Sequence, residues 1–383
     1  MKILFLVERP TQFEAPFFRY VRTHHPAHTL RVLFTGANVA APAFDPELGF
    51  AVDWGIDLLS GYEHAAFPAD WRRGWLADEL RGNRWDLLVT NGYRQREYRR
   101  ATALARRLRI ATALRLDSDA TGSSHLALAA KRLLFGQVLA RRYDLFLGVG
   151  TRTTDYLERC GVDAARCGRL PYAVDVEHFR AASGIAAAAR TALRQKLGVP
   201  AAARVVLAVA KLNPREGPKD LVGAAGLLGA DVWLLVAGSG PDRDALELAA
   251  RAAAPERVRF LGYVPYPELP SLYAAADLFV HAAHREHWGV SVAEALACGL
   301  PAIVSTGVGA GRDLIEPGQN GFVYRAGDAA ELADRIAAAL ALPLQEVRRT
   351  NREVLAGWDY PAAWEGLLAA ARQARDGVAR PAP

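Results

Sequence analysis

The chain has 383 residues, of which 51% are hydrophobic and 23% are charged. This composition is typical of a folded globular protein and excludes an intrinsically disordered one. No apolar run reaches the about 18 residues that a membrane-spanning helix needs, and MKILFLVE leads to charged Glu8 and Arg9 instead of a signal-peptide cleavage region. We therefore expect a cytoplasmic protein, and the length suits two α/β domains of about 180 residues each.

The net charge of +6 comes mostly from arginine. One predicted helix region carries Arg94, Arg96, Arg99, Arg100, Arg106, Arg107 and Arg109. Such a face is usually just solvated, but it could also hold the chain peripherally at the inner face of an anionic membrane, or bind an anionic acceptor. Nucleic acid is not an expected partner, because the arginines lack interleaved aromatic residues and a recognised binding motif.

Strands and helices alternate through the first half of the chain. Short apolar runs predict strands at residues 2–8, 30–36, 85–93, 110–118 and 143–150. A helix is expected after the first strand, at 16–23, and after each of the last three strands, which predicts a doubly wound sheet. The first strand is not followed by a GxGxxG fingerprint, which argues against a nicotinamide or flavin enzyme. Residues 44–64 are loop-rich, and could line an acceptor pocket or simply cover the sheet.

Asp117 and Asp119 form a DxD pattern at the end of a predicted strand. A pair of this kind can hold a divalent metal on a diphosphate, which would be a rival mechanism. Aspartates also commonly cap strand-to-helix turns, and three-residue matches occur often by chance. We therefore interpret the pair as a turn.

The α/β pattern restarts after the alanine-rich residues 180–203. Strands are predicted at 204–212, 231–241, 257–264, 276–282, 300–305 and 321–324. The predicted fold is therefore α/β, with two Rossmann-like doubly wound domains facing across a cleft. We place the first domain at 1–178 and the second at 179–358, and expect a C-terminal helix within 359–383.

Two glutamates frame the most informative stretch of the chain, 286–301. Glu286 follows a predicted strand, whereas Glu294 lies about one turn into a helix that begins near Val290. The unpaired amides near Gly289, Val290 and Ser291 offer a seat for a phosphate. Glu294 suits the hydroxyls of a ribose, and Glu286 faces whatever is attached beyond the phosphates. Together these groups predict a site for a nucleotide diphosphate sugar.

The same stretch resembles the signature of the retaining GT-B glycosyltransferases of family 4. That signature usually reads E-x-F-G-x-x-x-x-E-A-x-A-x-G-x-P, and Trp288 replaces its phenylalanine. The resemblance is strong in the second half of the chain and weak in the first. It implies transfer of a sugar from a nucleotide diphosphate donor to an acceptor with retention of configuration. It also implies that the donor sits mainly in the second domain, that Glu286 positions the donor sugar, and that the last helix packs back on the first domain.

Residues 210–221, AKLNPREGPKDL, resemble the family's diphosphate loop, which supplies an arginine and a lysine. Lys211 fills the arginine position. Glu216 stands where the family has lysine, which is a real departure. Arg215 or Lys219 could replace the lost cation, and the choice between them stays open.

Further donor contacts follow from the resemblance. Gly238 lies in AGSGP, which resembles a turn that passes close to the nucleotide. Backbone groups of Leu261 and Tyr263 are expected beside the base, and His287 and Trp288 beside the donor. In the first domain, the family's sugar-contacting histidine is missing after the strand at 110–118. Its role could fall to Arg115, Asp117 or His125, and we take the first two as catalytic candidates together with Glu286.

The expected reaction needs no metal or other cofactor, because amides and basic side chains would face the departing diphosphate. His281, His284 and His287 look like metal ligands, but three-residue steps converge only on a helix. The donor base, the donor sugar and the acceptor stay open; the acceptor could be a bacterial surface polysaccharide, a glycolipid or a small molecule. Two other functions are retained: a non-catalytic nucleotide-sugar-binding subunit, suggested by Glu216, and a GT-B epimerase or phosphorylase.

Overall fold

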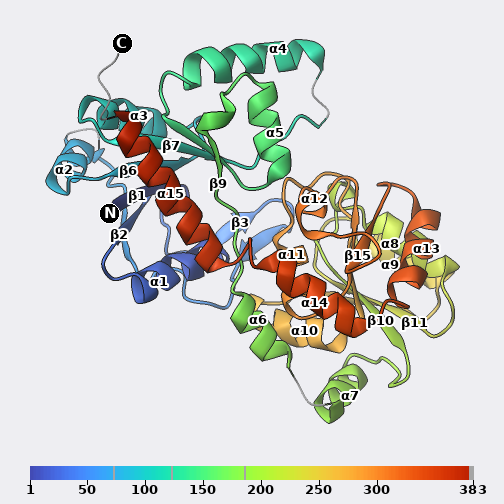
Figure 1. The fold of residues 1–383 in the computed structure, drawn as a ribbon. Helices are drawn as coiled ribbons and strands as arrows, with labels where there is room; N and C mark the ends of the chain where they lie inside the picture. Colours follow the sequence, from blue (N-terminus) through green and yellow to red (C-terminus); the bar gives the residue numbers. More distant parts are fainter. Residues whose placement is uncertain (72–73, 122–123, 185–186, 379–383) are drawn as a thin grey trace. The chain divides into compact units, whose positions relative to one another are not determined.

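The computed structural model describes residues 1–71, 74–121, 124–184 and 187–378. Contacts divide the chain into two compact units. Unit 1 contains Met1–Ala41, Asp57–Ala173 and the segment from Tyr360 onward, and unit 2 contains Pro42–Ile56 and Val174–Asp359. Each unit is built on a parallel sheet covered by helices (Figure 1).

The sheet of unit 1 has the strand order β5-β2-β1-β6-β7-β8-β9, and its strand pairs are parallel. Its strands are β1 (Lys2–Val7), β2 (Thr29–Phe34), β5 (Glu63–Ala66), β6 (Leu87–Asn91), β7 (Ala111–Leu116), β8 (Leu145–Gly148) and β9 (Cys167–Arg169). Its helices are α1 (Glu14–His24), α2 (Trp75–Gly82), α3 (Arg96–Arg107), α4 (His125–Leu133), α5 (Thr151–Arg159) and α15 (Tyr360–Val378). The strands β5 and β9 were not expected from the sequence.

Strand β1 is an interior strand of this sheet and is buried on both faces from Ile3 to Val7, which explains the continuous apolar sequence of these residues. Successive side chains of a strand point to opposite faces. Accordingly, Phe5 packs in one core with residues of α1 and α15, whereas Leu4 and Leu6 pack in another with residues of α2 and α3. The sheet of unit 1 is therefore enclosed by helices from three separate parts of the chain.

Helix α15 contributes Trp364, whose side chain is fully buried, to the core of unit 1. The helix contacts α1, β6, β7 and β9. It follows unit 2 in the sequence but belongs to unit 1 by its contacts.

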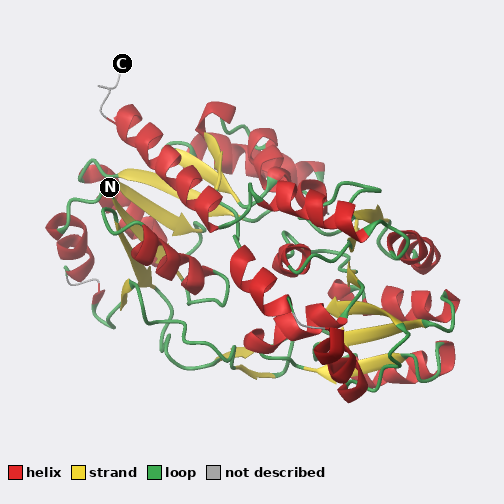
Figure 2. Cartoon of the chain, turned by 60° about the horizontal axis from the view of Figure 1, so that its bottom comes forward, coloured by secondary structure: helices red, strands yellow, loops and turns green. Residues whose placement is uncertain are grey.

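The sheet of unit 2 has the strand order β12-β11-β10-β13-β14-β15, again with parallel pairs. Figure 2 draws the strands of the chain in yellow, with helices in red beside them. Its strands are β10 (Arg204–Val209), β11 (Val232–Ala237), β12 (Val258–Gly262), β13 (Leu278–His281), β14 (Ala302–Ser305) and β15 (Gly321–Tyr324). Its helices are α6 (Val176–Ser183), α7 (Ala187–Lys196), α8 (Pro218–Leu227), α9 (Arg243–Ala253), α10 (Leu269–Ala275), α11 (Val290–Ala297), α12 (Gly311–Leu314), α13 (Ala329–Ala339) and α14 (Leu344–Leu355).

The direction of winding in unit 2 reverses between β10 and β13. The chain builds outward from β10 to β12 and then returns to pair β13 against the other side of β10. In open parallel sheets, ligands bind outside the carboxyl ends of the strands at such a reversal point. The loops that follow β10 and β13 therefore mark the expected ligand edge of unit 2.

A small antiparallel hairpin from early in the sequence belongs to unit 2. It consists of β3 (Ala43–Asp45) and β4 (Phe50–Val52). The Tyr263 hydroxyl donates to the Asp53 carbonyl over 2.8 Å, and the Tyr266 amide donates to the Trp54 carbonyl over 3.2 Å. The sequence analysis had placed residues 42–56 in the first domain; by contacts they group with the second unit.

Among the described residues, no helix is both long enough and apolar enough to cross a membrane.

Candidate functional site

Three loops at the carboxyl edge of the unit 2 sheet are held together by backbone hydrogen bonds. The His284 amide donates to the Arg215 carbonyl over 2.8 Å, which joins the loop after β13 to the loop after β10. The Glu286 amide donates to the Gly307 carbonyl over 3.1 Å, and the Gly309 amide donates to the Glu286 carbonyl over 2.9 Å. Glu286 is thereby fixed between the other two loops.

Two glycines make this close packing possible. Gly217 has φ +63, and a Cβ there would lie 2.2 Å from the Ala282 carbonyl oxygen. A Cβ at Gly309 would lie 1.9 Å from the His287 carbonyl oxygen. Gly309 is therefore packed against the segment that carries Glu286.

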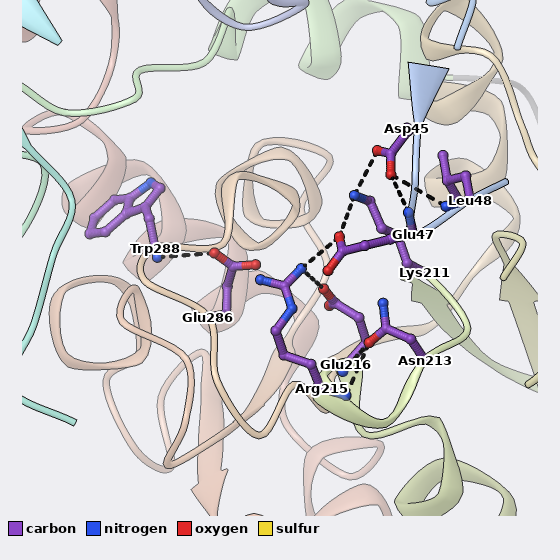
Figure 3. Close-up of polar contacts among 9 residues, drawn as sticks. All are labelled: Asp45, Glu47, Leu48, Lys211, Asn213, Arg215, Glu216, Glu286 and Trp288. Carbon is purple, nitrogen blue, oxygen red and sulfur yellow. Dashed lines mark hydrogen bonds and ion pairs between the residues drawn. The ribbon is translucent and has the colours of Figure 1, made fainter. Parts of the chain in front are cut away.

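The basic residues of the loop after β10 are paired with carboxylates of the hairpin. Lys211 Nζ lies 2.7 Å from Asp45 Oδ2 and 2.6 Å from Glu47 Oε2 (Figure 3). Arg215 Nη2 lies 3.1 Å from the same Glu47 oxygen and 2.8 Å from Glu216 Oε1. Burial lowers the pKa of Lys211, but the bonds to Asp45 and Glu47 outweigh it and raise the pKa above its ordinary value. Lys211 is therefore a firmly charged cation, already matched by two anions.

Glu216, the residue in the family's lysine position, is buried. The Asn213 side chain accepts from the amides of Arg215 and Glu216, which fixes the turn over 214–216. Burial and the nearby charge of Glu286 raise the pKa of Glu216 to about 7. The loop thus presents an acid, partly matched by Arg215, where the family resemblance implies a cation. Lys219, the other replacement considered, is exposed on α8.

His281 ends β13 and is only 4% exposed. Among the residues that the structure describes, neither of its ring nitrogens has a hydrogen-bond partner. Burial lowers the pKa of His281 below its ordinary value, although Glu286 acts in the opposite direction. Ligand atoms of Glu216, His281 and Glu286 all lie within 4.8 Å of one another.

The start of α11 lies beside these groups. Gly289 precedes the helix with φ +104, and a Cβ there would lie 3.4 Å from His281 Nε2. Val290 and Ser291 form the first turn, where amides lack intrahelical partners. The sequence predicts that a phosphate binds to these amides, and this binding stays a prediction.

Glu294 is buried on α11 and accepts a 2.9 Å hydrogen bond from the Tyr273 hydroxyl. Burial raises its pKa to about 7, and the bond from Tyr273 opposes that shift. Glu286 is less buried, and its Oε1 accepts from the Trp288 amide over 3.3 Å. The indole of Trp288 is buried and stacked on Trp358 with ring centroids 4.6 Å apart, so it shapes the loop by packing.

The remaining donor candidates in unit 2 lie around the ends of β11 and β12. The Gly238 amide donates to the Gly262 carbonyl over 2.7 Å, which ties the two strand ends together. Leu261 lies in β12, and the ring of Tyr263 meets Phe50 of the hairpin at 5.6 Å. His287 is partly buried in the loop before α11. The backbone readout proposed for Leu261 and Tyr263 stays a prediction.

The other two catalytic candidates, Arg115 and Asp117, lie in unit 1. Arg115 is buried, and its nitrogens donate to the Glu14 carboxylate and to the carbonyls of Leu170 and Pro171. Asp117 accepts from the Tyr172 hydroxyl over 3.2 Å. These contacts give Arg115 a structural role within unit 1, and the catalytic roles of both residues stay predictions.

The histidines do not form the metal set that their spacing suggests. His284 Nε2 lies 2.9 Å from Asp220, which also accepts from the Tyr324 hydroxyl. His281 instead meets Glu216 and Glu286. Sequence reasoning missed this cluster and the hairpin carboxylates. A glutamate in place of the family's lysine at position 216 was a sequence signal for the cluster of Glu216, His281 and Glu286. Asp45 and Glu47 have no comparable signal in the sequence.

Comparison with known proteins covers part of the chain by sequence and nearly all of it by fold. Residues 189–353 match the family model of glycosyl transferases group 1. This region contains β10 to β15 and thus the loops of the candidate site in unit 2. The match thus covers the part of the chain that carries these loops.

Several relatives carry the name D-inositol 3-phosphate glycosyltransferase. That of Salinispora tropica is 34% identical over 186 residues, covering 45% of this chain and 38% of its own length. That of Geodermatophilus obscurus is 31% identical over 272 residues, covering 64% of this chain and 58% of its own length. The chain thus spans between about two fifths and three fifths of these relatives.

Solved structures share the fold over almost the whole chain. HepE of Anabaena in complex with UDP has a TM-score of 0.75 at 20% identity, covering 96% of this chain and 99% of that one. Sucrose-phosphate synthase of Thermosynechococcus elongatus has a TM-score of 0.70 at 18% identity, covering 98% and 100%. Together with the two sheets, these neighbours confirm the predicted α/β fold of GT-B type with two Rossmann-like domains.

Proposed function

We propose that this chain transfers a sugar from a nucleotide diphosphate donor to an acceptor, with retention of configuration as in family 4. The observation that carries the proposal is the position of Glu286, Glu294 and Lys211 around the loops at the winding reversal of unit 2. Parallel sheets bind ligands at such a point. The match of residues 189–353 to glycosyl transferases group 1 supports the same assignment.

Each group has a role that its surroundings suit. The amides of Gly289, Val290 and Ser291 at the start of α11 would receive the diphosphate, with Lys211 supplying charge. Arg215 would assist Lys211, because its guanidinium lies in the same ion-pair network. Glu294 would bind the ribose hydroxyls.

The proposed chemistry is attack by the acceptor on the face of the sugar that the diphosphate leaves. The departing phosphate oxygen would take the acceptor's proton, and fixed positive charge would stabilise the charge that develops on it. Glu286 would orient the sugar and would not form a bond to it. From the sequence, this step is expected to need no metal.

The first test is binding of UDP, GDP, ADP and dTDP to the purified chain by isothermal titration calorimetry, with and without EDTA. UDP is the first choice, because HepE was solved with UDP. Transfer is then assayed with a polyol phosphate acceptor, as suggested by the relatives named for inositol 3-phosphate. The anomeric configuration of the product, read by NMR, tests retention. Absence of binding to all four nucleotides contradicts the proposal.

A second candidate function is a nucleotide-sugar-binding subunit that does not catalyse transfer. The buried acid Glu216 in the lysine position favours it, because an anion there opposes a diphosphate leaving group. Donor binding without transfer or hydrolysis would support this second function and reject the first.

A further inference from the structure

The side chains of Glu216, His281 and Glu286, which we call the EHE cluster, come from the loop after β10, the end of β13 and the loop after β13, respectively, but lie close together. Their ligand atoms lie within 4.8 Å of one another. Glu216 and His281 are 5% and 4% exposed, and Glu286 is partly buried. Two carboxylates that lie beside an imidazole in a largely buried position need a compensating positive charge.

The protein itself supplies only part of that charge. Arg215 reaches Glu216 Oε1 but also binds Glu47 of the hairpin. His281 is the clearest sign of a missing partner, because both of its ring nitrogens are buried and make no hydrogen bond to any described part of the chain. Buried polar atoms in native proteins are nearly always satisfied. An imidazole left unsatisfied beside two carboxylates points to a ligand.

We propose that the EHE cluster binds one divalent transition-metal ion, of the Mn²⁺ or Zn²⁺ type, through one imidazole nitrogen and two carboxylates. Nitrogen and oxygen donors of this kind suit both ions. Metal bonds of about 2.0–2.2 Å hold ligand atoms about 3.2–3.6 Å apart around a tetrahedral ion. The observed spread of up to 4.8 Å therefore needs side-chain adjustments of about 1 Å.

The position of the cluster indicates what the ion does. Glu216 occupies the place of the lysine that the family resemblance assigns to the diphosphate, and Gly289 at the start of α11 lies against His281. An ion held here restores the positive charge that the lysine would have supplied, and leaves coordination positions for a phosphate oxygen. This role rests on the proposed function, whereas the metal site itself does not. It also revises the expectation of metal-independent transfer.

The metal site is tested without nucleotide. The full chain is stripped with EDTA and titrated with Mn²⁺ while electron paramagnetic resonance follows the free ion; Zn²⁺ is then measured by competition. We expect one bound ion per chain. Glu216→Gln and His281→Asn should each weaken binding by about 10-fold or more, because loss of a group that only orients a metal ligand already costs about 10–100-fold. Glu268→Gln, at an exposed carboxylate of the same unit, is the matched control and should bind like the wild type.

Circular dichroism and thermal unfolding verify that each variant is folded. If His281→Asn does not fold, the nearly isosteric Glu216→Gln decides alone. The site is rejected if the wild type binds neither ion, or if folded Glu216→Gln keeps wild-type affinity.

A further variant tests whether the ion acts on the donor. Glu216→Lys should lose the ion and bind UDP equally well with and without EDTA, whereas the wild type should lose about tenfold in UDP affinity when the metal is removed. If EDTA does not change the UDP affinity of the wild type, the proposed role of the ion at the diphosphate is rejected. Metal binding without binding of any nucleotide upholds the site and rejects the proposed function instead.

Discussion

Lys211 and Glu47, which lie 164 residues apart in the sequence, form an ion pair of 2.6 Å inside unit 2. A donor diphosphate that uses Lys211 must therefore compete with a carboxylate that already occupies it. Asp45 reinforces this competition from the same hairpin. The hairpin acids and the proposed ligand thus share one cation.

Replacing Glu47 with Gln should tighten nucleotide binding. The change removes an anion from Lys211 and Arg215. The side chains of Lys211, Glu47 and Arg215 are 31%, 38% and 41% exposed, so solvent screens these ion pairs and the gain in nucleotide affinity is modest. We expect UDP affinity to rise about 2–5-fold in isothermal titration calorimetry at low salt, and less at high salt. Asp231→Asn, which breaks the exposed Arg204 ion pair of the same unit, is the control. Unchanged or weaker binding by Glu47→Gln would show that the hairpin does not compete.

Replacing Lys211 with Met should weaken binding of nucleotide diphosphates. The substitution keeps much of the side-chain length but removes a charged donor that is worth about 1.5–3 kcal/mol at a phosphate. Affinity for UDP should fall about 10–100-fold, whereas affinity for uridine, which carries no phosphate, should hardly change. Equal losses for UDP and uridine would indicate a damaged fold in place of a lost phosphate contact.

The proposed ribose contact of Glu294 can be tested with the sugar itself. If Glu294 binds the hydroxyls, the wild type should prefer UDP to 2′-deoxy-UDP by about 1–3 kcal/mol, and Glu294→Gln should lose most of this preference. Tyr273→Phe is the matched control, because it removes the neighbouring hydroxyl and keeps the carboxylate. If Glu294→Gln keeps the preference for UDP over 2′-deoxy-UDP, Glu294 does not bind the ribose hydroxyls.

Glu294 should also make stability depend on pH. Burial raises its pKa in the folded chain to about 7, above the ordinary value of 4.5. The folded state therefore holds a proton that the unfolded state releases between pH 4.5 and 7, so this group destabilises the fold as pH rises through that window.

Glu294→Gln cannot ionise, so it should be more stable than the wild type at pH 8 by roughly 1–3 kcal/mol and similar to it at pH 4. Urea unfolding at both pH values measures the difference. A stability gap that is the same at pH 4 and pH 8 would mean that Glu294 does not titrate as its burial implies.

Most of the fold could be predicted because buried parallel strands have continuous apolar sequences. The run at 2–8 and its counterpart at 204–212 both contain such strands. Strand β5, with the sequence EHAA, was missed because its residues are polar or small and it lies at the sheet edge. Strand β9 is only three residues long and gives no periodicity to detect.

The candidate site was predictable only where it is local in sequence. Glu286 and Glu294 lie eight residues apart on one strand-loop-helix element. A sequence motif can therefore identify both residues. The ion pair of Asp45 with Lys211 spans 166 residues and depends on where a hairpin folds. The sequence pattern relates His281 only to nearby histidines, and their spacing does not favour a metal site. Its actual neighbours include Glu216, which comes from another loop.

Helix α15 covers one face of the unit 1 sheet, although all of unit 2 is made before it. During synthesis, Phe5 and its neighbours on that face must therefore wait for residues 360–378 to leave the ribosome. In many proteins an N-terminal domain completes its folding while the next domain is still being synthesised; unit 1 of this chain cannot do so. A nascent chain stalled before Tyr360 would expose an apolar surface, and should be an attractive substrate for chaperones.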